Sequence, residues 1–389
     1  MTFEQQLRIP GPTPLPERVI RSASRPMINH RGPEFKELLA EITGGVQRAL
    51  GTTNDILFFP ASGSGGLEAA VVNMLGPGER ALFCSMGSFG QRWIEIARTY
   101  GVDVVTVISE PGQSTDLSEM DRILSADDSI ATVFVTHNET STGVTNDIAG
   151  IAQLVKRHGR QLCLDSVSGA PSIPVDMDEL GIDVVVVGSQ KGWMAPPGLT
   201  MIAVSEAAMA RASLPGLPRW YLDFNRELKQ QQAGQTATTP ALQVMFALQE
   251  GLRMLNEEGQ EACQARHRRV AERIRAGLEA MDLRILADPA VRSDTVTAVH
   301  NPTAGPEELR EFLAHLRTEY GLVLAGGQGE LKGHIFRVGH LGYIDDGDAY
   351  SVLDSIERGL AAIGVRPVDA RPLAAAQNAG DLRVPVFAS

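Results

Sequence analysis

The chain has 389 residues, is 43% hydrophobic and carries a formal net charge of −12. The length suggests two to three domains with sizeable cores, and the acidic balance argues against nucleic-acid binding. Three scattered cysteines without a CxxC motif argue against a disulfide framework or thiolate zinc site, and no signal-peptide core or run of ~18 apolar residues occurs, so we expect a cytoplasmic protein that does not span a membrane.

The first part of the chain predicts an arm, a helix, a strand and a second helix. Four prolines within residues 9–16 favour an extended arm, which we place at 1–25. Apolar spacing predicts an amphipathic helix over 34–50. A short strand over 56–60 then passes through the glycine-serine run 61–66 into a helix over 67–75.

From there strands and helices alternate along the chain. The sequence predicts helices over 90–100 and 147–158 and strands over 81–84, 102–108, 132–136, 162–165, 183–187 and 201–204. This alternation is typical of an α/β fold with a mostly parallel sheet and helices on both faces. We therefore expect a large domain over residues 26–260, with a turn-rich polar segment at 215–240.

A smaller α+β domain is predicted over residues 261–365. A long helical pattern covers 241–281 and breaks near Gly259. Short strands over 283–286, 295–300 and 336–338 then alternate with helices over 306–319 and 347–363. The alanine- and proline-rich residues 366–389 are expected to form a loosely packed tail.

Lys191 is the best candidate for a reactive amine. It follows four consecutive valines, Val184 to Val187, which predict a strand buried on both faces. Ligands of open α/β sheets bind beyond the carboxyl ends of the strands, where Lys191 falls. The other lysines lie in polar or loop-like contexts and are expected to be solvated charges, namely Lys36, Lys156, Lys229 and Lys332.

Two further features point to the same edge of the sheet. The glycine-serine run 62–66 lies between a strand and a helix N-terminus, where backbone N–H groups can bind a phosphate; it could also be a tight turn alone. Asp165 ends an apolar strand, where its carboxylate could serve chemistry or merely cap the next segment. Together, a phosphate cradle, a carboxylate and a lysine are the groups that pyridoxal 5'-phosphate requires.

These and other motifs resemble a known family. The chain is similar to the class V aminotransferases of the fold-type-I pyridoxal phosphate enzymes, in the alanine–glyoxylate and serine–glyoxylate branch. The resemblance runs from Gly11 to about Gly364 and rests on Gly11-Pro12-Thr13-Pro14, His30-Arg31-Gly32-Pro33-Glu34-Phe35, Ser62-Gly63-Ser64-Gly65-Gly66, Phe89-Gly90-Gln91-Arg92, Thr136-His137-Asn138-Glu139-Thr140-Ser141-Thr142-Gly143, Asp165-Ser166-Val167-Ser168, Gly188-Ser189-Gln190-Lys191, Ala195-Pro196-Pro197-Gly198-Leu199, Thr239-Pro240 and Phe336-Arg337-Val338-Gly339-His340-Leu341-Gly342.

The resemblance implies a role for each site residue. Lys191 would form the Schiff base with the cofactor and then carry the proton, and Asp165 would pair with the ring nitrogen. The remaining cofactor contacts would come from Ser64, Gly65, Gly66 and Gln190 at the phosphate, Thr140 near the ring hydroxyl, Phe89 on the ring face and Thr239 at the neighbouring subunit's phosphate. Arg337 would bind the substrate carboxylate, for which a planar guanidinium is well suited.

The resemblance thus implies a homodimeric transaminase that acts on small-molecule amino and 2-oxo acids. The amino donor would be alanine or serine and the acceptor glyoxylate or pyruvate; aspartate, ureidoglycine, an aminophosphonate or pyridoxamine are alternative donors. From another class, a catalytically silent binding relative stays open, although it would not need both Lys191 and Asp165. A cysteine desulfurase is disfavoured because Cys263 falls in a helical pattern instead of a loop.

Some readings do not involve catalysis. His137 and His340 have no partner at metal-ligand spacing and are expected to be hydrogen-bonded structural residues, so no metal site is predicted. Phe89 and Trp193 could be core aromatics, and Arg337 could pair with an internal carboxylate. The sequence also departs from the family, which often has tryptophan at Phe89, threonine or histidine at Gly66 and tyrosine near Thr236.

Overall fold

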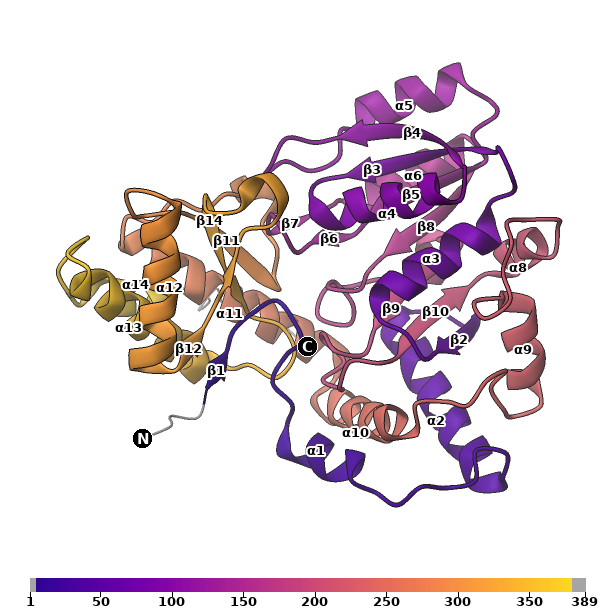
Figure 1. Cartoon of the computed structure of the whole chain (residues 1–389), viewed down its shortest axis with the longest axis horizontal. Coiled ribbons are helices and arrows are strands. Elements are labelled where there is room, and N and C mark those ends of the chain that lie inside the picture. The colour runs from indigo at the N-terminus through magenta and orange to yellow at the C-terminus, as the bar shows by residue number, and fades with distance from the viewer. Residues whose placement is uncertain (1–4, 380–389) are drawn as a thin grey trace, which may run out of the picture.

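The computed structural model describes residues 5–379. Figure 1 shows two bodies, each built around its own sheet, with the larger body on the right and the smaller on the left. Within the described residues the large sheet has seven strands in the order β2-β10-β9-β8-β5-β3-β4, namely β2 (Asp55–Phe59), β3 (Arg80–Ser85), β4 (Asp103–Ile108), β5 (Thr132–Thr136), β8 (Gln161–Asp165), β9 (Val184–Gly188) and β10 (Thr200–Val204).

The large sheet is mostly parallel, as the alternation of strands and helices predicts. Neighbouring strands from β4 to β9 run parallel, whereas β10 runs antiparallel to both β9 and β2. The valine strand β9 lies in the middle and is buried along its whole length. Val185 and Val187 enter the core on one face, while Val184 and Val186 enter the core on the other.

Helices cover both faces of this sheet. One face packs against α2 (Pro33–Leu50), α5 (Leu117–Ala126), α6 (Ile148–Arg157), α7 (Met177–Leu180) and α10 (Leu242–Glu258). The other packs against α3 (Gly63–Met74), α4 (Ser88–Thr99), α8 (Glu206–Ala212) and α9 (Phe224–Gln232). Two short strands, β6 (Asn138–Glu139) and β7 (Val144–Thr145), form a hairpin after β5.

The smaller body has an antiparallel sheet in the order β11-β14-β13, made of β11 (Val296–His300), β13 (Ala325–Gly326) and β14 (Ile335–Gly339). Its core is closed by α11 (Gln260–Ala280), α12 (Pro306–Tyr320), α13 (Asp346–Ala362) and α14 (Arg371–Asn378). Near the N-terminus, β1 (Gln6–Leu7) pairs in parallel with β12 (Leu322–Val323), and α1 (Glu17–Ala23) follows (Figure 1). The exact domain limits stay a prediction.

Several elements differ from the sequence-based expectations, and α5, α7 and α8 were not predicted. The strand expected over 283–286 is reduced to one isolated bridge between Ile285 and Val299. The segment 215–240 contains α9, and the arm contains α1. The expected loose tail begins with α14, whose Ala376 is fully buried against the smaller body; residues 380–389 lie outside the described part. No helix between residues 5 and 379 is long and apolar enough to cross a membrane.

Candidate active site

The candidate residues gather where the parallel strands of the large sheet end. Asp165 is the last residue of β8 and lies opposite Val186 of the neighbouring strand. Lys191 follows β9 by three residues. Because both strands run in the same direction, their carboxyl ends bring the two side chains to one edge of the sheet.

Lys191 is a buried amine, whereas the other four lysines are exposed, as the sequence predicts. Its side chain is 8% exposed, and Nζ donates a hydrogen bond to the Pro10 carbonyl. Burial lowers the pKa of Lys191 to about 8; the positive charges of Arg337 and Arg92 act in the same direction, and Asp165 opposes them. An amine with this pKa is partly neutral near physiological pH and can act as a nucleophile or base.

Asp165 is a buried carboxylic acid. It is 4% exposed, and its Oδ1 accepts a hydrogen bond from the Val167 N–H at 2.9 Å. Burial raises the pKa of Asp165 to about 7; Glu139 raises it further, while the Val167 N–H, Lys191 and Arg92 lower it. The residues that follow form turns and no helix, so Asp165 is not a helix cap.

The glycine-serine run forms the first turn of α3. No side chain in the described part of the chain caps this helix start, although N–H groups there can bind an anion. Gly66 faces the sheet: a Cβ at this position would overlap Thr200 Oγ1 and approach Val186 Cγ1 to 2.5 Å. In this structure, the close packing leaves no room at position 66 for a threonine or histidine side chain.

Phe89 and Arg92 extend the site from α4. Phe89 is half-buried and belongs to neither core, so it is not a core aromatic, whereas Trp193 is fully buried in the core. Arg92 lies over the Phe89 ring at 4.8 Å and donates a hydrogen bond to Ser64 Oγ at 3.0 Å. Arg92 therefore connects the start of α3 to the aromatic ring, and its charge acts on both Lys191 and Asp165.

Arg337 reaches the site from the smaller body. It lies on β14, is 5% exposed, and donates to the carbonyls of Gly326 at 3.0 Å and Thr140 at 3.1 Å. Within residues 5–379 it forms no ion pair, which removes the internal-carboxylate reading, and Glu139 acts on it only at longer range. Thr140 itself donates to Ser168 Oγ at 2.9 Å.

Gln190 lies next to Lys191, whereas Thr239 is not connected to the other candidate site residues within the described part of the chain. Gln190 precedes Lys191, and its side-chain oxygen is buried with no hydrogen-bond partner in the described structure. Thr239 is exposed in the loop before α10, and no hydrogen bond between described residues ties it to the other candidates. The structure thus assembles every predicted site residue except Thr239 within one chain.

Glu139 and Arg92 are site residues to which the sequence assigned no role. Glu139 is fully buried and accepts hydrogen bonds from the N–H groups of Phe89 and Gly90, both at 3.1 Å, and from Ser141. It thereby fixes the start of α4, which carries Phe89. Both residues lie inside motifs that the chain shares with the family, and this was the one sequence feature that could have marked them as site residues.

The two histidines are hydrogen-bonded structural residues, as predicted. His137 Nδ1 lies 2.9 Å from Ser166 Oγ, and His340 Nε2 lies 2.8 Å from Thr297 Oγ1. Burial lowers the pKa of each ring, to about 4 for His137 and about 3 for His340. Both rings are therefore neutral at physiological pH.

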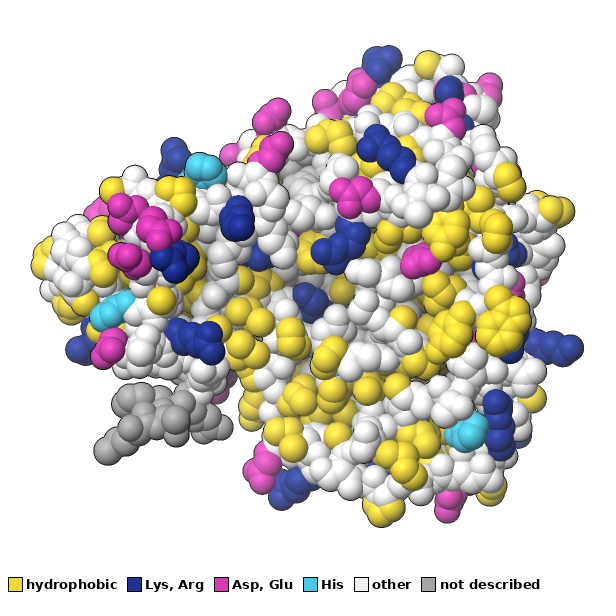
Figure 2. Space-filling model, viewed as in Figure 1, with side chains coloured by type: hydrophobic (Ala, Val, Ile, Leu, Met, Phe, Trp, Pro, Cys, Tyr) yellow, Lys and Arg dark blue, Asp and Glu magenta, His cyan; other side chains and the backbone are white. Residues whose placement is uncertain are grey.

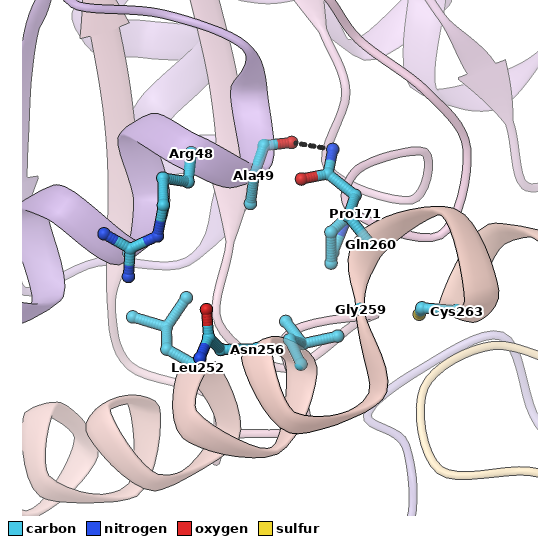
Figure 3. A pocket seen from close by; sticks show the side chains of 10 residues that line it. Arg48, Ala49, Pro171, Leu252, Asn256, Gly259, Gln260 and Cys263 are labelled. Atoms are coloured by element: carbon cyan, nitrogen blue, oxygen red, sulfur yellow. Dashed lines mark hydrogen bonds between the residues drawn. The ribbon is translucent and has the colours of Figure 1, made fainter.

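A separate pocket of about 160 Å³ lies where α2, α10 and α11 meet. Figure 3 shows Arg48, Leu252 and Asn256 on one side of it, and Gln260, which donates a hydrogen bond to the Ala49 carbonyl at 3.0 Å. None of its lining residues is a candidate site residue. Its buried apolar lining residues, Ala49, Leu252, Leu255 and Cys263, belong to the core of the larger body, so this pocket lies away from the candidate site.

An α/β sheet with a buried lysine, a buried carboxyl group and an uncapped helix N-terminus at one edge places an amine beside groups that can bind an anion. Residues 10–332 match the family described as aminotransferase class V, and the chain belongs to that family. It is 38% identical to the soluble hydrogenase 42 kDa subunit of Anabaena cylindrica, covering 94% of this chain and 95% of that protein.

Two further similarities carry aminotransferase names. The chain is 35% identical to the L-aspartate–glyoxylate aminotransferase of Paracoccus denitrificans, covering 97% of this chain and 96% of that protein. The crystal structure of pyridoxamine–pyruvate aminotransferase from Mesorhizobium loti superposes with a TM-score of 0.90 at 28% identity, covering 95% of each chain. The fold and the enzyme class expected from the sequence are confirmed.

Proposed function

We propose that this aminotransferase uses pyridoxal 5'-phosphate to move an amino group from a small amino acid, alanine or serine, to glyoxylate or pyruvate. The observation that carries the proposal is the buried amine of Lys191, with a pKa of about 8, beside the buried carboxyl of Asp165. Charged groups are rarely buried in this way outside functional sites.

The residues at the sheet edge fit this cofactor. The uncapped N-terminus of α3 with Ser64 and Gly65 suits a phosphate, and Gln190, the residue before Lys191, would donate to it from its side-chain amide N–H. Asp165 suits a protonated ring nitrogen, and the half-buried Phe89 suits a ring face. When bound, the cofactor supplies an aldehyde that condenses with amines and a ring that withdraws electrons.

Four of the chain's own residues would then act. Lys191 would hold the cofactor through its amine and, when that amine is free, would carry a proton to and from the substrate Cα. Asp165 supplies the negative charge that keeps the ring nitrogen protonated. Arg337 offers its guanidinium to the α-carboxylate of each substrate in turn, and Thr140 orients it through its carbonyl.

The donor is the least constrained part of the proposal. The relative from Paracoccus denitrificans is named for aspartate, and the structural neighbour from Mesorhizobium loti for pyridoxamine. These donors, together with ureidoglycine and aminophosphonates, are the alternatives to alanine and serine. We also propose a cytoplasmic homodimer in which Thr239 contacts the partner's cofactor; the three unpaired, buried cysteines fit a reducing compartment.

The Anabaena cylindrica relative is named as a hydrogenase subunit, but the described residues of this chain give no support for a hydrogenase function. Among residues 5–379 no three His, Cys, Asp or Glu side chains are grouped so that they could hold a metal ion. The buried groups at the sheet edge are a lysine, a carboxylate and arginines, a set suited to anionic organic molecules. We therefore keep amino-group transfer as the single proposal.

Borohydride trapping of the purified protein tests the proposal. The protein should be yellow, and reduction followed by peptide mapping should place the cofactor on Lys191; Lys191→Ala should abolish turnover, while the exposed Lys229→Ala should not. A colourless protein would instead support a silent binding relative. A panel of amino acids assayed against glyoxylate and pyruvate would then identify the donor.

A further inference from the structure

Residues 6–8 of the N-terminal arm are attached to the smaller body. β1 runs parallel to β12, and the Arg8 N–H donates to the Val323 carbonyl at 2.9 Å. The Gly339 N–H, at the end of β14, donates to the Arg8 carbonyl at 2.7 Å. The buried Arg8 guanidinium also forms an ion pair with Asp348 of α13. This part of the arm is therefore held by two strands and one helix of the smaller body.

The following residues of the arm lie against Lys191. Its Nζ donates to the Pro10 carbonyl, and Thr13 Oγ1 donates to the Lys191 backbone carbonyl at 3.2 Å. Gly11 permits this contact because a Cβ there would lie 2.6 Å from Lys191 Nζ, and because its φ of 118° disfavours other residues. Among the described residues, Pro10 supplies the hydrogen-bond acceptor of the buried amine.

We propose that residues Arg8–Thr13 form a strap that positions the amine of Lys191 and makes that position depend on the smaller body. The inference rests on the proposed function, since it takes Lys191 as the reacting amine. A lysine side chain has many rotamers, and the Pro10 carbonyl selects one of them whenever the amine is not bound to another group. Pro10 and Gly11 act through Lys191 and are positioning residues.

The anchor of the strap lies close to the candidate carboxylate-binding residue. Gly339, which holds Arg8, is two residues from Arg337 on β14. A movement of the smaller body would therefore shift two groups at once: the Arg337 guanidinium and the Pro10 carbonyl that accepts from Lys191. Since a reacting group misplaced by about 1 Å can cost ~10²-fold in rate, this connection can matter for catalysis.

The rate of borohydride trapping of pyridoxal 5'-phosphate on the cofactor-free, full-length protein tests the strap. Arg8→Ala and Asp348→Ala each remove the ion pair and should slow trapping at Lys191 by ~3- to 10-fold. The double variant should be no slower than the slower single variant, because both changes release the same anchor. Asp348→Ala also removes the acceptor of the Asp345 N–H in the capping box of α13, so Arg8→Ala is the cleaner of the two variants. Asp354→Ala is the matched control, since it removes an exposed ion pair with Arg358 on the same helix.

Gly11→Ala tests the other end of the strap. Its Cβ would lie 2.6 Å from Lys191 Cδ and Nζ and would push the Lys191 side chain away from the Pro10 carbonyl, so the protonated amine would lose its acceptor. The pH midpoint of trapping, expected near 8 in the unmodified protein, should therefore fall. A change that only loosened packing would not lower it.

The outcomes separate the strap from the proposed function. If Arg8→Ala and Asp348→Ala trap the cofactor on Lys191 at the unmodified rate, or if their effects add, the strap is wrong while the function stands. If Gly11→Ala leaves the midpoint unchanged or raises it, the positioning role of Pro10 is likewise wrong. If the cofactor is trapped on another lysine, the proposed function fails. Thermal melting of each variant confirms that it is folded, and should Gly11→Ala not fold, the Arg8 and Asp348 variants decide.

Discussion

At the residue scale, the site holds more buried charge than its own hydrogen bonds compensate. Asp165 accepts one backbone hydrogen bond, and Lys191 donates one to a carbonyl. Burial raises the pKa of the first to about 7 and lowers that of the second to about 8, so both groups are less often charged than in water. A bound cofactor with a phosphate and a ring nitrogen would supply the missing partners, which is how functional sites trade stability for activity.

Asp165→Asn should therefore stabilise the cofactor-free protein while slowing turnover. The folded pKa of about 7 exceeds the ordinary 3.8, so the native state retains a proton that the unfolded state releases, and stability falls as pH rises between these values. The loss amounts to at most about 4 kcal/mol. Melting at pH 7 should give a higher Tm for the variant, with turnover at least ~10²-fold slower. Near-normal turnover would reduce Asp165 to a structural residue.

Arg337→Ala should raise the KM for the amino donor and the oxo acid together. A single guanidinium that binds both α-carboxylates is lost to both half-reactions, and charged hydrogen bonds of this kind correspond to ~10- to 100-fold. Arg337→Lys should rescue little, because an ammonium cannot form two parallel hydrogen bonds. Steady-state kinetics with each substrate varied would show this, and an effect on only one substrate would make Arg337 a side-chain selector.

Apart from the roles that the family resemblance implied, residue roles were predictable from the sequence only where a strand preceded the residue. Lys191 and Asp165 follow apolar runs, so their edge of the sheet could be derived. Glu139 accepts hydrogen bonds from Phe89 and Gly90, residues about fifty positions away, and Arg92 reaches Ser64 across the gap between two helices. No local pattern predicts such contacts, because they arise only when the chain is folded.

At the element scale, α3 is positioned by glycine. Gly66→Ala should push the helix away from Thr200 and Val186 and so displace the phosphate cradle. We expect a loss of about 1–3 kcal/mol of stability and weaker cofactor binding. Gly44→Ala on α2 is the control: its Cβ would meet only an Arg48 nitrogen at 3.5 Å, so the change should stabilise the protein by about 0.5–1 kcal/mol. Urea unfolding and cofactor titration of both variants would decide, and equal effects would contradict the prediction.

Most helices and strands followed from hydrophobic period, and the exceptions have physical causes. α9 was missed because its sequence is polar except for Phe224 and Leu228. Phe224 is buried in the core, and the buried carboxylate of Glu227 accepts a hydrogen bond from the Ala237 N–H at 2.9 Å. Residues 283–286 looked like a strand because apolar residues alternate there; Leu283 and Ile285 are buried, yet only Ile285 forms a bridge to the sheet. β10 runs antiparallel because the connection over residues 189–199 returns the chain beside β9, and hydrophobic pattern does not encode that path.

At the scale of the whole molecule, the site depends on both bodies, since Lys191 lies in the larger body and Arg337 in the smaller. Figure 2 shows hydrophobic side chains spread over the region of α3, α9 and α10, whereas charged side chains are denser over the smaller body. Large apolar residues near the former region are exposed, among them Trp220 at 66% and Tyr221 at 42%. Exposed apolar surface of this kind is typical of an interface and supports the proposed homodimer.

The position of Thr239 allows a direct test of that homodimer. Thr239 is exposed and tied to no other candidate in its own chain, so we expect it to complete the partner's phosphate site. Thr239→Glu should then weaken cofactor binding by charge repulsion while leaving the fold intact. Mixed dimers of Thr239→Glu with Lys191→Ala distinguish the two arrangements. If Thr239 acts across the interface, the one site that keeps Lys191 also receives an intact Thr239 from the partner, and each mixed dimer regains up to half of the normal activity. If Thr239 acts within its own chain, every site in the mixed dimer is defective and no recovery occurs.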